Sequence, residues 1–228
     1  MKKFLRYFSP FEWCLWGASC LTVTLSYLLS GDFHTLALFA SLLGVTALIF
    51  LAKGNVIGQA LCAVFALLYA LVSYEQRYFG EMLTYLCMTL PSAIVAVISW
   101  LKHPSKRGVS EVQIARMTRK KWILVCLLTG VVTLLFYFVL AYFQTNKLLV
   151  STLSVATSFF ASTLTILRSP FYAIAYACND IVLIVLWIFA SIAFIGYLPM
   201  VFCFFAFLAN DSYAFITWRK LQREQSTR

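Results

Sequence analysis

The sequence predicts an all-α membrane protein with eight transmembrane helices. Of its 228 residues, 62% are hydrophobic and only 11% are charged, and the mean hydropathy is +0.87. Soluble domains contain roughly 45–50% apolar and about 25% charged residues. The apolar residues fall into eight segments of about 20 residues, the length that a helix needs to span a bilayer. The basic residues gather in the connections between these segments.

The predicted helices follow one another through short connections, with one exception. Their ranges are residues 11–29, 33–52, 56–74, 80–101, 122–143, 148–167, 171–194 and 197–218. The exception, residues 102–121, is polar and contains Pro104 and Gly108. The first apolar segment is longer than the about 7–15 residues of a signal-peptide core, and no A-x-A cleavage site follows it. We therefore expect the first segment to remain as a membrane helix.

The distribution of Lys and Arg predicts the orientation in the membrane. If both termini are cytoplasmic, all of the 18 basic residues except Arg77 and Lys147 lie on the inside. Cytoplasmic loops carry this excess of positive charge in membrane proteins. Topology thus accounts for the net charge of +10, and we expect the lipid bilayer rather than a nucleic acid as the partner of the chain.

Metal and nucleotide chemistry find no support in the sequence. The seven cysteines are scattered singly through apolar segments, with no C-x-x-C pair, and His34 and His103 lie at segment edges. No G-x-x-x-x-G-K-[ST] motif is present in the sequence, which argues against direct coupling to ATP. We expect no metal site, no cofactor and no catalytic residue.

A shift of 118 residues reveals a weak internal repeat. It aligns residues 99–102 (Ser-Trp-Leu-Lys) with residues 217–220 (Thr-Trp-Arg-Lys), and Tyr69 with Trp187. Helices two to four then repeat as helices six to eight. A single linker helix between them gives both repeats the same orientation, as in SWEET-like transporters. The sequence predicts a SWEET-like 3+1+3 core of two parallel repeats, preceded by one N-terminal extra helix.

This arrangement implies four parts of the chain. They are an N-terminal transmembrane helix (1–32), a first three-helix repeat (33–101), a basic cytoplasmic loop with the linker helix (102–147), and a second three-helix repeat with a cytoplasmic tail (148–228). In folds of this kind the substrate binds near the middle of the membrane between the repeats.

The segment 168–187 places polar and aromatic groups in the middle of a predicted membrane helix. Unsatisfied polar groups there cost several kcal/mol, so they usually mark a functional site. At helical spacing, Tyr172, Tyr176, Asn179 and Trp187 share one face, with Asp180 just beside it. Such a face suits a flat ligand with polar edges.

Two other predicted helices carry similar groups. In the last helix, Asn210 and Tyr213 share one face and Asp211 lies on the next, while Gln59 and Tyr69 share a face of the third helix. We predict that the substrate-binding residues are Gln59, Tyr69, Tyr172, Tyr176, Asn179, Asp180, Trp187, Asn210, Asp211 and Tyr213.

A structural alternative exists for the polar groups. The two Asn-Asp pairs, at 179–180 and 210–211, would also hold adjacent helices together through hydrogen bonds. We interpret two further stripes as packing faces. One is the small-residue stripe of Ser154, Ser158, Ala161 and Thr165, and the other is the set Tyr85, Ser92 and Ser99.

Three runs of residues together resemble a known family. They are Tyr172-x-x-x-Tyr176-x-x-Asn179-Asp180 up to Trp187, then Asn210-Asp211-x-Tyr213-x-Phe215-x-x-Trp218, and earlier Lys53-Gly54-Asn55-x-x-Gly58-Gln59. This pattern is similar to the PnuC family of bacterial vitamin and nucleoside transporters, and the likeness covers nearly the whole chain. It implies a homotrimer in the bacterial inner membrane that takes up nicotinamide riboside by facilitated diffusion, with intracellular phosphorylation trapping the substrate.

One departure from that family leaves the ligand open. Members typical for nicotinamide riboside would carry a glutamine shortly after the proline of the fourth helix, whereas Ser92 and Ala93 follow Pro91 here. A deoxynucleoside, thiamine or riboflavin is the alternative substrate. Proton coupling through Asp180 or Asp211 is a variant of the transport hypothesis. Two alternatives belong to other classes of function. One is an intramembrane aspartyl enzyme that uses these two carboxyls, and the other is a receptor with a basic lipid-binding loop.

Overall fold

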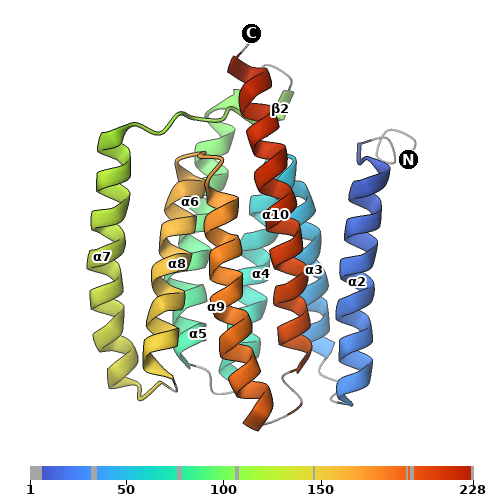
Figure 1. The fold of residues 1–228 in the computed structure, drawn as a ribbon, viewed down its shortest axis with the longest axis vertical. Coiled ribbons are helices and arrows are strands. Elements are labelled where there is room, and N and C mark those ends of the chain that lie inside the picture. Colours follow the sequence, from blue (N-terminus) through green and yellow to red (C-terminus); the bar gives the residue numbers. More distant parts are fainter. Residues whose placement is uncertain are drawn as a thin grey trace.

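The computed structural model describes residues 7–31, 35–75, 79–105, 108–145, 147–193, 195 and 198–226. Eight helical runs in this part of the chain form one bundle with nearly parallel axes (Figure 1). They are α2 (Pro10–Ser30), α3 (Thr35–Ala52), α4 (Val56–Glu75), the continuous run of α5 (Phe79–Thr84), η1 (Tyr85–Thr89) and α6 (Leu90–Leu101), α7 (Arg119–Tyr142), α8 (Leu148–Ile166), α9 (Tyr172–Ala193) and α10 (Leu198–Ser226).

The helix ends agree with the ranges predicted from hydropathy to within a few residues, apart from the last helix. α10 continues to Ser226, well past the predicted end at residue 218. The additional turns carry Arg219, Lys220 and Arg223 and extend past the ends of the other helices (Figure 1). Hydropathy marks where a helix leaves the membrane, whereas its hydrogen-bonded backbone continues.

Six helical stretches in the described residues are long and apolar enough to cross a membrane. They are Val56–Tyr74, Glu81–Leu101, Arg119–Tyr142, Leu148–Ile166, Tyr172–Phe189 and Leu198–Ser226. A shorter apolar stretch, Leu38–Ala52, lies in α3. The outer surface of the bundle is apolar as well: Leu134 and Phe138 on α7 are 62% and 64% exposed. Such a surface needs lipid rather than water around it, so the predicted multi-pass membrane protein is confirmed.

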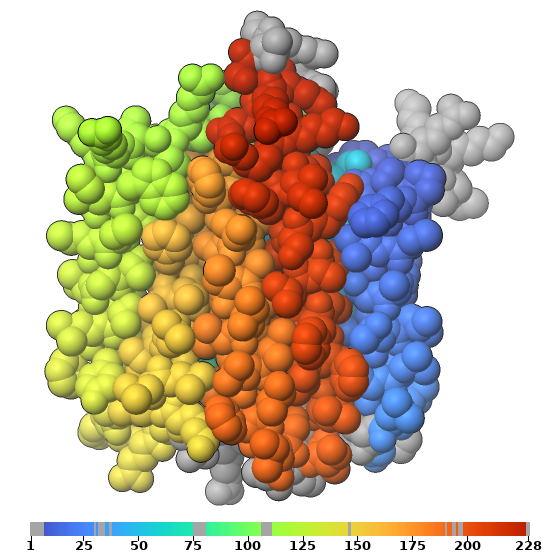
Figure 2. Space-filling model, viewed as in Figure 1, coloured from blue at the N-terminus to red at the C-terminus, as the bar shows by residue number. Residues whose placement is uncertain are grey.

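Six of the helical runs close into a ring. α3 packs against α4, α4 against α6, α6 against α8, α8 against α9, α9 against α10, and α10 back against α3. α7 lies outside this ring against α8, and α2 lies outside it against α3 and α10. Figure 1 shows α7 and α2 at opposite edges of the bundle. Figure 2 shows α7, α8, α9, α10 and α2 side by side on one face.

A polar network ties α2 to the ring. Ser9 and Glu12 form a capping box at the start of α2. Glu12, only 3% exposed, pairs with Lys53 at 3.1 Å and accepts a hydrogen bond from the Tyr213 hydroxyl at 3.0 Å. Tyr7 accepts a hydrogen bond from the Asn55 amide at 2.8 Å, and burial raises the pKa of its hydroxyl above the ordinary value. Three elements, α2, the α3–α4 turn and α10, therefore meet at one buried carboxylate.

The turn between α3 and α4 depends on two glycines. Gly54 has a φ of 66°, a conformation that glycine adopts without strain. At Gly58 a Cβ atom would lie 2.6 Å from the backbone nitrogen of Leu51. Only glycine at position 58 lets the start of α4 approach the end of α3 this closely.

The fourth long helix contains one π-helical turn, η1. Pro91 follows it and has no N–H to donate to the preceding turn. The N–H of Leu90 instead donates to the carbonyl of Tyr85, five residues earlier. Turns of this kind are frequent at functional sites, and η1 carries Tyr85 and Thr89 into the centre of the bundle.

The polar connection predicted as a loop contains a short antiparallel hairpin, β1 (Pro104–Ser105) and β2 (Gly108–Val112). Val112 is 2% exposed, and its N–H donates to the Gly54 carbonyl at 3.0 Å. The side chain of Gln225 in α10 donates to the Val112 carbonyl at 3.1 Å. Loop composition did not predict these partners because they come from remote segments of the chain. The hairpin and the C-terminal end of α10 lie together at one end of the bundle (Figure 1).

Candidate functional site

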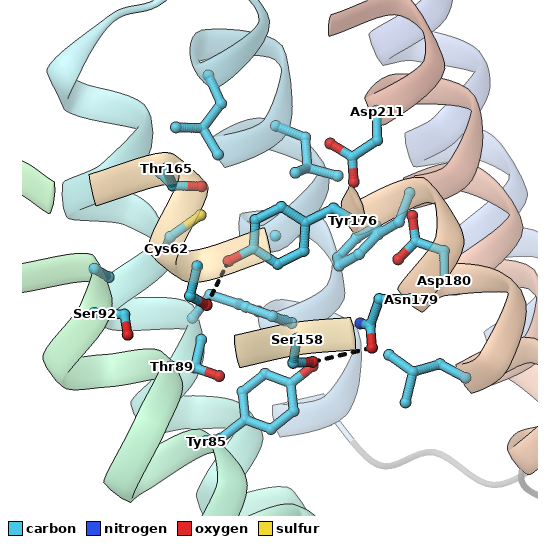
Figure 3. Close-up of a pocket in the computed structure, with 18 of the residues that line it drawn as sticks. Cys62, Tyr85, Thr89, Ser92, Ser158, Thr165, Tyr176, Asn179, Asp180 and Asp211 are labelled. Atoms are coloured by element: carbon cyan, nitrogen blue, oxygen red, sulfur yellow. Dashed lines mark hydrogen bonds between the residues drawn. The ribbon is translucent and has the colours of Figure 1, made fainter. Parts of the chain in front are cut away.

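The ring of six helices encloses a cavity of about 80 Å³. Every element of the ring contributes to its wall, and so does η1 (Figure 3). The polar or aromatic lining residues are Gln59, Cys62, Phe65, Tyr85, Thr89, Ser92, Ser158, Ser162, Thr165, Tyr176, Asn179, Asp180, Phe204, Phe207 and Asp211. The cavity thus combines flat apolar surfaces with hydrogen-bonding groups, which is the usual composition of a small-molecule site.

Asn179 is held in a fixed orientation by α8. Its side-chain oxygen accepts hydrogen bonds from the Thr157 hydroxyl at 2.7 Å and the Ser158 hydroxyl at 3.0 Å. The NH₂ group of the planar amide takes no part in these two bonds, the second of which is drawn in Figure 3. Two N–H donors on a buried side chain are thereby preoriented for an acceptor.

Tyr176 is positioned in a similar way, one helical turn before Asn179. Its hydroxyl lies 2.9 Å from the Ser162 hydroxyl of α8. The ring lines the cavity opposite Tyr85 of η1 (Figure 3). Two aromatic faces therefore lie on either side of the cavity, where a flat ring can stack.

Two carboxyl groups lie in the cavity wall, Asp180 from α9 and Asp211 from α10. Each residue is 3% exposed, and the two carboxyls are close enough to interact directly. Asp180 Oδ2 is buried without a hydrogen-bond partner in the described structure. Among the described residues, no Lys, Arg or His lines the cavity to neutralise the two groups.

Aromatic rings bound the cavity towards both ends of the bundle. Towards the end that lacks the hairpin, Phe65 lies 6.0 Å from Tyr85 and 5.7 Å from Phe207, and Tyr69 lies 4.2 Å from Tyr85, between ring centroids. Towards the hairpin end, Trp218 lies 5.3 Å from Trp100 and 4.6 Å from Tyr172. The cavity thus lies between two aromatic layers.

The structure brings five of the ten sequence-predicted site residues into the cavity wall: Gln59, Tyr176, Asn179, Asp180 and Asp211. Three more belong to the aromatic layers or lie against them. Tyr172 donates its hydroxyl hydrogen to the Leu51 carbonyl at 3.3 Å, Tyr69 packs on Tyr85, and Trp187 lies beside the hydroxyl of Tyr69.

The remaining two predicted residues face away from the cavity. The Asn210 side chain donates to Ser19 of α2 at 3.0 Å and to the Ala206 carbonyl at 2.8 Å. Tyr213 donates to Glu12. Neither residue is in the cavity wall, so the structure gives both a place in the contact between α10 and α2.

The sequence pattern assigned several of the lining residues to helix-packing faces. Ser158 and Thr165 on α8, together with Tyr85 and Ser92, belong to stripes assigned to helix contacts, yet they also line the cavity. Their hydroxyl groups were the available signal, since packing alone needs only small residues. Cys62 and Phe65 gave no signal because each resembles an ordinary buried apolar residue.

Comparison with known proteins identifies the family of the chain. Residues 34–220 match the family described as "Nicotinamide mononucleotide transporter". The chain belongs to this transporter family. The resemblance to PnuC transporters is therefore confirmed, and the family consists of transporters rather than enzymes.

Individual members of the transporter family cover most of the chain. The "Nicotinamide riboside transporter PnuC" of Neisseria mucosa is 27% identical over 198 residues, covering 84% of this chain and 74% of the relative. The protein of the same name from Haemophilus influenzae is 26% identical over 222 residues, covering 96% and 94%. The structure is similar to the "Crystal structure of the Vitamin B3 transporter PnuC", with a TM-score of 0.82, 25% identity, and coverage of 96% of this chain and 94% of that one.

Proposed function

We propose that this transporter takes up nicotinamide riboside by facilitated diffusion through the cavity described above, and that phosphorylation in the cytoplasm traps the substrate. The proposal is supported by the names of the two curated relatives, both riboside transporters. It is also supported by the cavity, which offers stacking rings, amide and hydroxyl groups to a ring with a carboxamide and a sugar.

The charge of the cavity distinguishes the riboside from the mononucleotide in the family description, and this observation carries the proposal. Two carboxyl groups line the cavity, and none of the described lining residues is basic. A phosphate group is recognised by Arg, Lys or helix N-termini and would be repelled by Asp180 and Asp211. The nicotinamide ring of the riboside carries a fixed positive charge, which two carboxyls favour.

A direct role in binding is proposed for Gln59, Tyr176, Asn179, Asp180 and Asp211. The donors of Asn179 suit the carboxamide oxygen, and the hydroxyls of α8 suit the sugar. Tyr69, Tyr172 and Trp187 would act in the aromatic layers that open and close. The contacts of Asn210 and Tyr213 favour a supporting role at α2.

The proposed architecture is two parallel repeats, α3–α4–α6 and α8–α9–α10, joined by α7 and preceded by the extra helix α2, with the four-part division at residues 32, 101 and 147. The ring of six helices, with α7 and α2 outside it, supports this arrangement. Further support comes from equivalent tryptophans: Trp100 donates to the Thr165 carbonyl and Trp218 to the Leu51 carbonyl. Each bond runs from the last helix of one repeat to the end of the first helix of the other.

Transport would require the ring to open. A cavity of about 80 Å³ is smaller than the roughly 300–1,000 Å³ of ligand pockets, so a nucleoside requires the helices to move apart. Rocking of one repeat against the other would open the two aromatic layers in turn. We propose eight spans, both termini in the cytoplasm of a bacterial cell, and a homotrimer. The basic residues at the hairpin end support the orientation.

A second candidate is carriage of another nucleoside or vitamin, namely a deoxynucleoside, thiamine or riboflavin. The observation that favours it is the wall after Pro91, where Ser92 and Ala93 line the cavity in place of the expected glutamine. The hydroxyl group of Ser92 and the methyl group of Ala93 are smaller than a glutamine side chain and leave room for a ring with other polar substituents. The two candidates share the same cavity and differ only in what it holds.

Binding and uptake measurements test both candidates. Purified protein is titrated calorimetrically with nicotinamide riboside, nicotinamide mononucleotide, thiamine, riboflavin and thymidine, and we expect the riboside to bind most tightly and the mononucleotide not to bind. Uptake into proteoliposomes should follow the riboside gradient and persist when a protonophore dissipates the proton gradient. Uptake that collapses on dissipation would replace facilitated diffusion with proton-driven transport, and a preference for the mononucleotide would refute the charge argument.

A further inference from the structure

The buried pair of Asp180 and Asp211 carries more negative charge than its surroundings compensate. Both residues line the cavity, both are 3% exposed, and they come from adjacent helices. The Asp180 carboxyl lies in the wall of this space (Figure 3), and its Oδ2 atom is buried and unpartnered in the described structure. An unpaired acceptor in such a place is costly unless a ligand or a proton satisfies it.

The groups that face the pair provide no positive charge. The titratable side chains that interact with one or both carboxyls are Cys62 of α4, Tyr85 of η1, Tyr172, Tyr176 and Cys178 of α9, and Cys203 of α10. The lining residues of α3, α6 and α8 are apolar or carry hydroxyl groups. All of these groups are neutral near pH 7, so no described neighbour compensates a second negative charge.

Two carboxylates this close, away from water, cannot both stay ionised when nothing else is bound. We propose that Asp180 and Asp211 share one proton in the empty cavity and release it when a cationic ligand binds. In this exchange one O–H bond breaks, its electron pair stays on the carboxylate, and the proton passes to solvent. The fixed charge of the ligand takes the place of the proton, so the total charge of the site is unchanged.

This inference rests on the proposed function only for its first probe, nicotinamide riboside. The inference itself concerns a class of ligand. The site binds flat cations in exchange for a proton, whereas an uncharged nucleoside binds without releasing a proton. Thiamine, a cationic vitamin of different shape, and thymidine, a neutral nucleoside, are therefore the comparison ligands.

Calorimetric titration in phosphate and in Tris at the same pH near 7 counts the protons, because the two buffers differ in their heat of protonation. We expect about one proton released per riboside and none per thymidine. In the double variant Asp180→Asn and Asp211→Asn, the release should vanish and the affinity for the riboside should fall at least about tenfold. The matched control is Glu81→Gln, which alters a carboxyl that is also buried but absent from the cavity wall, and it should keep the full release.

The wild-type protein provides a second test that does not depend on the folding of the double variant. One exchanged proton makes cation binding stronger as the pH rises, by up to about tenfold per pH unit while the pair is protonated, whereas thymidine affinity stays constant.

Riboside binding without proton release, or equal release with thymidine, would overturn the exchange. If thiamine binds with proton release and the riboside does not bind, the proton exchange is supported and the proposed substrate is wrong. If only neutral nucleosides bind, the exchange itself is refuted.

Discussion

The indole rings of Trp100 and Trp218 lie 5.3 Å apart, and each donates its N–H to a backbone carbonyl of the other half of the chain. Trp100 donates to Thr165 at 3.1 Å and Trp218 donates to Leu51 at 2.9 Å. Both residues are fully buried. The pair therefore closes the cavity towards the hairpin end with two matched hydrogen bonds.

Replacing either tryptophan by phenylalanine should weaken this closure. Trp100→Phe and Trp218→Phe each remove one hydrogen bond to a buried carbonyl, which costs about 1 kcal/mol. The Thr165 and Leu51 carbonyls keep backbone donors, the N–H groups of Arg168 and Gly54. We expect a lower melting temperature for each variant, measured by intrinsic fluorescence in detergent. Trp122→Phe is the control, because Trp122 stacks on Phe160 outside the pair. Equal melting temperatures in all four proteins would show that the two bonds do not stabilise the observed conformation.

Asn179 and Asn210 should separate binding from stability. Asn179→Ala removes the oriented amide of the cavity wall, and we expect riboside affinity to fall at least about tenfold, the equivalent of ~1.4 kcal/mol. Asn210→Ala removes a hydrogen bond to Ser19 of α2 and should leave affinity within about twofold while it lowers stability by about 1 kcal/mol. Calorimetric titration and thermal unfolding of both variants check this. The reverse pattern would place Asn210 in the substrate site.

Gly44 should be essential for the volume of the cavity. A Cβ atom there would lie 2.8 Å from Cζ of Phe207 and 3.0 Å from Cε2 of Phe65, so Gly44→Ala must push these rings into the cavity. We expect riboside uptake into proteoliposomes to fall at least about tenfold, with a stability loss of about 1–3 kcal/mol from overpacking. Gly130→Ala in α7 meets no atom within 4 Å and should behave like wild type. Normal uptake by Gly44→Ala would show that the open protein has space to spare at this wall.

In the buried ion pair of Glu12 and Lys53, removal of the cation should cost more stability than removal of the anion. Lys53→Met leaves a 3% exposed carboxylate without a counter-charge, and we expect a loss of about 1–3 kcal/mol. This is less than for a fully buried pair because the Lys53 side chain keeps 22% exposure. Glu12→Gln should cost less, and the double variant should recover part of the Lys53→Met loss. Thermal unfolding of the three variants measures this, and strictly additive losses would mean that the two groups do not interact.

The sequence predicted the helices well because membrane insertion depends on the length and apolarity of a segment. Both properties can be determined from a short stretch of sequence alone. Five of the ten predicted site residues line the cavity; they could be found in the sequence because buried polar groups in such helices are rare. It did not predict which member of each Asn-Asp pair faces the cavity. Neighbouring residues on a helix point about 100° apart; both Asn179 and Asp180 reach the cavity, whereas only Asp211 of the second pair does.

Other features depend on contacts that no local pattern encodes. The hairpin is held by Gly54 and Gln225, which lie far from it in the chain. The π-helical turn follows from Pro91, which on its own predicts only a missing hydrogen bond. The hydroxyl stripe of α8 was ambiguous because Ser and Thr are small enough to pack and polar enough to bind.

The network at Glu12 has a mechanical consequence. Since α2, the α3–α4 turn and α10 share one buried carboxylate, pulling one of them away would break the Lys53 ion pair or the Tyr213 hydrogen bond of Glu12. We expect these three elements to stay together at this end of the bundle, so that α2 acts as a brace and the two repeats rock about the contact between α3 and α10. The opening that admits a substrate would then lie across the ring, between α6 and α8. A label placed on α2 would report the stationary frame of the carrier, and one on α8 its moving part.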